Sequence, residues 1–117
     1  MIEGESVFIL GDNIESFPKK RGRKVCAYIT NNEEVPEFKN NDEALEWITK
    51  NKTIVPTFDS LESSVKWLEE NKIEDPIIYL GVYWNSQLNW EMDSEMVKRI
   101  ADVNATFCFS GYEVDEV

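Results

Sequence analysis

The fold is decided by Ile77–Val114, which reads IIYLGVYWNSQLNWEMDSEMVKRIADVNATFCFSGYEV. An apolar run is followed by a polar turn, a second alternating run, a segment with helical spacing and a final alternating run. Strands place every second side chain on one face, whereas helices bring residues three and four apart together. The stretch therefore predicts a β-hairpin, a short amphipathic helix and a closing strand.

The register of the expected hairpin follows from the side chains that must be buried, because a slip of one residue turns every side chain to the other face. A three-residue loop over 85–87 pairs Trp84 with Leu88. A two-residue loop would set Trp84 against Gln87, so we favour the longer loop. One face then carries only apolar side chains: Ile78, Leu80, Val82, Trp84, Leu88, Trp90 and Met92. The opposite face carries Tyr79, Gly81, Tyr83, Asn89 and Glu91.

The segment after the hairpin has the signals of a capped helix. Asp93 or Ser94 can cap its start, and Asn104 can end it in a left-handed conformation. An apolar stripe at helical spacing is formed by Met96, Ile100 and Val103, with Val97 beside it. In the final strand, Phe107 and Phe109 alternate with Thr106, Cys108, Ser110 and Tyr112.

The middle of the chain contains a repeat with an offset of twenty residues, 35–54 and 55–74. Six of eighteen aligned positions are identical: Val35/Val55, Pro36/Pro56, Phe38/Phe58, Trp47/Trp67, Asn51/Asn71 and Lys52/Lys72. Asn40 and Ser60 occupy equivalent cap positions. Each copy predicts an extended entry and a helix of about ten residues, because the apolar spacing is helical. We expect a helical pair on the sheet, with the tryptophans packed in it rather than used for binding.

The front of the chain predicts two strands, Ser6–Leu10 and Lys24–Thr30, joined by a basic segment from Pro18 to Lys24. The basic residues of that segment lie between Lys19 and Lys24. They are consistent with a phosphate-binding site, a localisation signal or a solvated loop, and we favour the loop. Altogether the pattern predicts an α+β fold over 1–117. This single small domain has a mainly antiparallel sheet of about five strands, with the helical pair and one C-terminal helix packed on it.

Composition narrows the function. A net charge of −11 argues against direct nucleic-acid binding, which needs Lys and Arg, and it steers cationic partners toward the protein or serves solubility alone. The chain has no histidine, so catalytic triads and His-based zinc sites are excluded. We expect no cofactor and no metal. Cys26 and Cys108 are expected to be reduced core thiols, with a disulfide or a reactive thiol as the alternative.

No apolar run approaches the roughly 20 residues that a membrane span needs, and the acidic N-terminus has too short an apolar run for a signal peptide. The sequence therefore predicts a cytoplasmic protein without a membrane partner.

The last third resembles the C-terminal part of a bacterial family described as domain of unknown function 4279. The similar features are the apolar strand Ile77–Tyr83, the turn 85–87, Ser94–Val97 opening a helix, Asn104–Ala105, and Phe107-x-Phe109-x-x-Tyr112. The resemblance covers about a third of the chain. It implies a small bacterial or phage cytoplasmic α+β domain, and it brings no catalytic residues.

These observations favour a non-catalytic protein-binding module, specifically an immunity or inhibitor protein that occludes a partner with a basic surface, such as a toxin or a defence nuclease. The expected contact surface is the second hairpin face, extended by the last strand: Tyr79, Tyr83, Asn89, Glu91 and Tyr112. Aromatic anchors dominate the energetics of many interfaces. Its expected electrostatic rim is an acidic run that contains Glu69, Glu70, Glu74 and Asp75.

Two other classes of function remain open. A phage anti-defence protein could imitate nucleic acid, with its carboxylates in place of phosphates. An uncharacterised enzyme could use paired carboxylates as general acid and base, with Glu91/Asp93 or Glu69/Glu70 as candidates. A regulatory domain with an unidentified ligand belongs with this last alternative.

Overall fold

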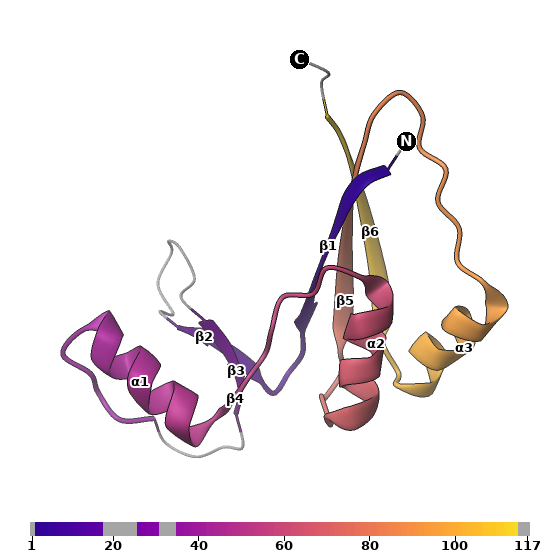
Figure 1. Cartoon of the computed structure of the whole chain (residues 1–117). Coiled ribbons are helices and arrows are strands. Elements are labelled where there is room, and N and C mark those ends of the chain that lie inside the picture. The colour runs from indigo at the N-terminus through magenta and orange to yellow at the C-terminus, as the bar shows by residue number, and fades with distance from the viewer. Residues whose placement is uncertain (1, 18–25, 31–34, 115–117) are drawn as a thin grey trace. The chain divides into compact units, whose positions relative to one another are not determined.

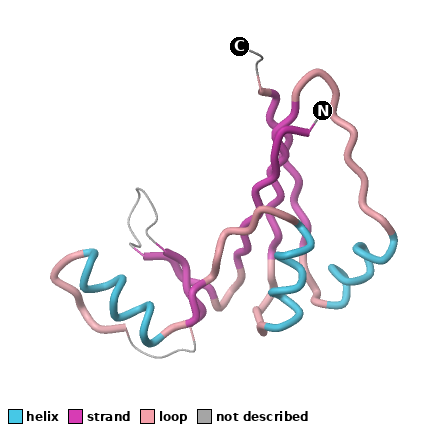
Figure 2. The backbone as a smooth tube through the Cα atoms, viewed as in Figure 1, coloured by secondary structure: helices cyan, strands magenta, loops and turns pink. Residues whose placement is uncertain are grey.

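The computed structural model describes residues 2–17, 26–30 and 35–114 (Figure 1). Six strands lie in this part of the chain: β1 (Ile2–Leu10), β2 (Ile14–Phe17), β3 (Cys26–Ile29), β4 (Thr53–Ile54), β5 (Ile77–Trp84) and β6 (Thr106–Glu113). Its three helices are α1 (Asn41–Asn51), α2 (Leu61–Glu70) and α3 (Ser94–Asp102) (Figure 2).

The α+β class predicted from the sequence is confirmed, since the described residues of this small domain form three helices and two mostly antiparallel sheets. Its residues divide into two compact units. The large unit comprises Met1–Gly11 and Thr57–Val117, and the small unit comprises Asp12–Pro56. The strands accordingly form two sheets of three, β1-β5-β6 and β2-β3-β4, and not one sheet of about five.

The sheet of the large unit has β5 at its centre, antiparallel to β1 and parallel to β6. Alternation along β5 sorts the side chains onto two faces. Paired residues share a face, so the register extends each face across the sheet. The inner face carries nearly inaccessible side chains: Val7, Ile9, Ile78, Leu80 and Val82. The open face carries Ser6, Phe8, Tyr79, Gly81, Tyr83, Cys108, Ser110 and Tyr112.

Helices α2 and α3 lie on one side of this sheet (Figure 1). Helix α2 packs against β1, and it buries Leu61, Val65 and Leu68. Helix α3 packs against α2 and buries Ile100. Because the buried strand residues are those of the inner face, both helices cover that face and leave the tyrosines on the other.

The predicted hairpin is wrong. Strand β5 forms as expected, but residues 85–93 are not a strand. Both edges of β5 are occupied by β1 and β6, so no edge remains for a hairpin partner. The polypeptide instead crosses over through α3, as a parallel pair requires. The loop also lacks the glycine that three-residue hairpin loops favour, and Ser86 adopts a φ of 66°.

Two apolar residues of the failed strand still pack on the inner face. The Trp90 ring stacks on Phe107 at a centroid distance of 5.8 Å and contacts Phe109 at 5.1 Å. A Cβ at Gly111 would lie 3.4 Å from Leu88. Both side chains are half-buried, so the apolar positions expected to be buried are covered only in part, and by a loop instead of a strand.

The small unit places α1 beside the antiparallel sheet β2-β3-β4. Tyr28 on β3 is 1% exposed, and its hydroxyl donates to Glu15 at 3.0 Å. Ala44 and Ile48 of α1 are buried. The Val55 N–H donates to the Ala27 carbonyl at 2.9 Å, which continues the pairing beyond β4.

The twenty-residue repeat is real, but its helices do not form a pair on one sheet. The first helix, α1, belongs to the small unit and the second, α2, to the large unit. Each contacts a strand of its own unit, β4 or β1. Each of these two amphipathic helices therefore buries its apolar stripe within its own unit, because each unit has a sheet of its own.

The predicted front strands agree with the structure in part. Strand β1 contains the expected Ser6–Leu10 and begins earlier, at Ile2. Strand β3 lies within the expected Lys24–Thr30, whereas β2 and β4 were not predicted. The basic segment from Lys19 to Lys24 lies outside the described residues.

Cys108 is a half-buried free thiol, as expected for its reduced state, but it lies on the open face and not in the core. Its partner across the sheet is Tyr79 of the open face. The core prediction is wrong because alternation along β6 places Phe107 and Phe109 on the inner face. Cys26 lies in β3, and its side chain is outside the described part.

Candidate binding face

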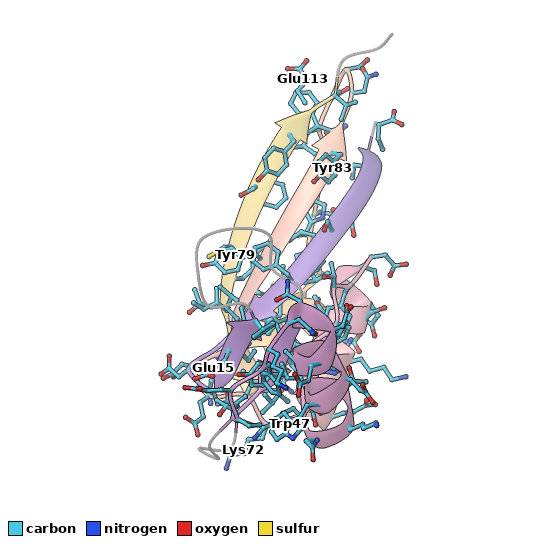
Figure 3. All side chains as sticks on the ribbon, turned by 90° about the vertical axis from the view of Figure 1, so that its left-hand side faces the viewer. Glu15, Trp47, Lys72, Tyr79, Tyr83 and Glu113 are labelled. Atoms are coloured by element: carbon cyan, nitrogen blue, oxygen red, sulfur yellow. The ribbon has the colours of Figure 1, made fainter. Side chains whose placement is uncertain are left out.

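The open face of the β1-β5-β6 sheet carries four aromatic rings in two stacks. Phe8 and Tyr79 stack with centroids 4.8 Å apart and planes 9° apart. Tyr83 and Tyr112 stack at 5.4 Å and 24°. Tyr79 and Tyr83 lie four residues apart on β5, which places the stacks one above the other along the strand (Figure 3).

A row of small residues separates the two stacks. Ser6, Gly81 and Ser110 are aligned across the three strands. With the rings above and below them, they line an open groove whose floor is Gly81. A Cβ at Gly81 would lie 3.4 Å from Tyr112 Cε2, so a longer side chain there would project into the groove.

Three of the four rings are exposed, and Tyr79 is half-buried. Phe8 is 44% exposed, Tyr83 41% and Tyr112 51%. No charged residue occupies the open-face positions that the described strand pairs define. An uncharged aromatic surface on a chain of net charge −11 is an exposed apolar patch, and such patches mark interaction sites.

The structure brings three of the predicted contact residues together, Tyr79, Tyr83 and Tyr112. It does not bring Asn89 and Glu91 to them, because the hairpin strand that was to carry both does not form. Both are exposed in the loop before α3. Sequence reasoning missed Phe8, whose alternation with Val7 and Ile9 was the available signal.

The predicted acidic rim does not border the open face. Glu69 and Glu70 lie on α2, which covers the inner face. Glu74 and Asp75 lie in the connection from α2 to β5, where Asp75 has a φ of 46°. The acidic residues are continuous in sequence, but the first two lie in the helix and the last two in the connection that precedes the sheet.

Glu69 instead belongs to an ion-pair cluster between α2 and α3. Arg99 Nη2 lies 2.6 Å from Glu69 Oε1, Arg99 Nε lies 3.2 Å from Glu69 Oε2, and Arg99 Nη1 lies 2.6 Å from Glu62 Oε2. The hydrogen bond from Arg99 lowers the pKa of the Glu69 carboxyl. Hydrogen bonds to Glu69 and then Glu62 raise the pKa of Arg99. Sequence reasoning missed this cluster, since 30 or more residues separate its partners.

In each carboxylate pair considered for acid–base chemistry, one member has a structural contact. Glu69 is held by Arg99 in a two-bond arrangement. Asp93 caps α3 by accepting from the Met96 N–H at 2.8 Å. Within residues 2–17, 26–30 and 35–114, no group of three or more Cys, Asp or Glu side chains is arranged to hold a metal ion.

In the same described ranges, none of the helices combines the length and apolarity needed to cross a membrane. Comparisons of the chain with protein-family models, curated proteins and solved structures found no match.

Proposed function

We propose that the protein is a non-catalytic binding module whose open sheet face docks on a protein with a basic surface. The observation that carries the proposal is the group of four stacked rings, three of them exposed, among open-face positions of the described strand pairs that hold no charged residue. Tyrosine combines a large apolar ring with a polar hydroxyl, and it is enriched among residues that dominate binding energy.

The net charge of −11 supports a basic partner. Long-range attraction accelerates encounter with a cationic surface, and the uncharged rings then exclude water at contact. An immunity or inhibitor protein that occludes a toxin or a defence nuclease would act in this way. Under this proposal the protein works in the cytoplasm, and the resemblance to domain of unknown function 4279 remains an expectation.

The nucleic-acid mimic is less well supported. A mimic needs free carboxylates on one surface, whereas two of the acidic residues on α2 are paired with Arg99. The enzyme alternative has no carboxylate pair free of a structural contact among those considered, because Asp93 and Glu69 are both hydrogen-bonded.

The test is affinity capture with immobilised protein, in which retained proteins are identified by mass spectrometry and then purified for titration. Wild type and a Tyr79→Ala/Tyr83→Ala variant are compared. Loss of two central anchors is expected to weaken binding at least about 30-fold, as for residues worth 2 kcal/mol or more. Val97→Ala is the control, because Val97 is 52% exposed on α3, away from the open face.

Equal binding by the double variant and the control would contradict the use of this face. Salt provides a second check. If steering and aromatic burial act as proposed, added salt slows association while dissociation changes little.

A further inference from the structure

Strand β6 forms an edge of its sheet in the part of the chain that the structure describes. On one side it lies beside β5 (Figure 3), and its eight residues pair with that strand in an unbroken register. On the other side, no strand of the described chain pairs with it. A row of unpaired backbone groups on such an edge is a template for another strand.

The outward backbone groups can be identified from two hydrogen bonds. The Thr106 N–H donates to the Pro76 carbonyl at 2.9 Å, and the Val114 N–H donates to the Trp84 carbonyl at 2.7 Å. Backbone groups alternate in direction along a strand, so even-numbered residues face β5. The odd-numbered residues face outward: Phe107, Phe109, Gly111 and Glu113. Their N–H and C=O groups have no hydrogen-bond partner in the described ranges.

The opposite edge of the sheet is protected. On β1, Val7 exchanges two backbone hydrogen bonds with Phe58, at 2.9 and 2.8 Å, and the register shifts between Ile2 and Gly4. Strand β6 has neither feature. Its sequence, TFCFSGYE, also lacks the lysine and proline that usually blunt an edge.

We propose that the β6 edge binds an extended segment of a basic partner, which adds a fourth strand to the sheet. Main-chain hydrogen bonds to the outward residues would supply affinity, and alternate side chains would supply specificity. On the open face, the neighbours of the incoming strand are Cys108, Ser110 and Tyr112. On the inner face they are Phe107 and Phe109.

The chemistry of the two faces defines the segment. On the open face the segment should carry arginine or lysine, because the Tyr112 ring can form a cation–π interaction with either. Apolar residues suit the inner face beside Phe107 and Phe109. The expected ligand therefore alternates basic and apolar residues. Its positive charge complements a chain of net charge −11, whereas a second copy of that chain would be repelled. This choice of a basic segment rests on the proposed function.

The test uses a blocked seven-residue peptide that alternates valine and arginine, titrated into ¹⁵N-labelled protein. At saturation, amide exchange at Phe107, Phe109, Gly111 and Glu113 should slow at least about tenfold. The even-numbered amides from Thr106 to Tyr112 already face β5 and should change little. Absence of protection at the four outward amides overturns the proposal. Protection that appears without peptide and rises with protein concentration also overturns it, because a second copy would then be the occupant of the edge.

Two N-methylated peptides test the backbone pairing. One is methylated at every valine and the other at every arginine, so in any strand orientation only one presents its N-methyl groups to β6. One peptide should lose binding and the other keep it. Equal behaviour of the two peptides overturns strand addition.

The Tyr79→Ala/Tyr83→Ala variant separates this inference from the proposed function. It retains the β6 edge, so peptide protection should persist even where partner binding is lost. If the alanines abolish partner binding and the peptide never protects β6, the open face stands as the binding site and the edge does not.

Discussion

The two copies of the repeat have the same local structure and different surroundings. Phe38 and Trp47 pack with centroids 5.8 Å apart and planes 51° apart, and the second copy repeats this geometry at 6.0 Å and 56°. In each copy an asparagine side chain near the helix end donates to the tryptophan carbonyl, at 2.8 and 2.9 Å. The equivalent caps Asn40 and Ser60 each accept from the N–H three residues on.

The copies differ in the burial of equivalent side chains, most clearly at Leu45 and Val65. Leu45 of α1 is 38% exposed, whereas Val65 of α2 is completely buried. Helix α2 contacts both β1 and α3, while α1 packs beside the short β4. The comparison teaches that local sequence specifies a capped helix with its aromatic contact, and that the depth of burial depends on what lies opposite.

The largest expected effect comes from truncating this position in both copies. Val65→Ala should lower the free energy of unfolding by about 2 kcal/mol, because two buried methyl groups and a residual cavity contribute. Leu45→Ala removes more atoms but should cost less than about 1 kcal/mol, since the side chain is partly solvated. Urea unfolding followed by circular dichroism measures both. Equal losses would mean that the copies are packed alike.

The caps provide a smaller and more local effect. Ser60→Ala should destabilise α2 by about 1 kcal/mol and Asn40→Ala should do the same to α1, because each removes the acceptor of one helix N–H. Amide hydrogen exchange, measured separately in α1 and α2, reports the loss of stability of each helix. Ser60→Asn is the matched control, since it installs the cap of the first copy and should retain protection. Faster exchange in the helix of the other copy would argue against local capping.

The smallest effect concerns the ion pairs that differ between the copies. Arg99 lowers the pKa of Glu69, so the pair stabilises the fold above the ordinary pKa of a glutamate, about 4.3. This contribution is lost as the pH falls through the lower folded value. Glu69→Gln should therefore make stability less dependent on pH on the acid side, as followed by urea unfolding at several pH values.

Glu46→Gln is the control for that series. Glu46 pairs with Lys50 within α1, and both side chains are about 70% exposed, so solvent screens the pair. Loss of this pair should leave the stability at acid pH close to that of the wild type. If stability depends on pH identically in the two variants, the ion pair between Glu69 and Arg99 adds nothing specific to the second copy.

Local features of the fold could be predicted because their causes lie within a few residues. Asp93 caps α3, and Asn104 ends the region with a φ of 57°, as its sequence position indicates. The division of β5 into a buried face and a tyrosine face also follows from alternation alone. Hence three of the residues proposed for binding, Tyr79, Tyr83 and Tyr112, share one surface.

The errors concern features that depend on distant partners. A hairpin over 77–92 is the nearest pairing in sequence, but β1, about seventy residues away, takes one edge of β5. The acidic run from Glu69 to Asp75 is continuous in sequence, yet Arg99 holds its first member against α3. Neither partner can be read from the residues on either side.

By itself, the sequence of this protein determined which side chains alternate, where helices are capped, and that one helical unit occurs twice. These properties depend on backbone geometry and on contacts between near neighbours. Only the tertiary structure decided which strands pair, which face stays open and which edge remains unpaired. Main-chain hydrogen bonds are the same for every strand, so the choice of partner depends on how the apolar faces of distant segments fit together.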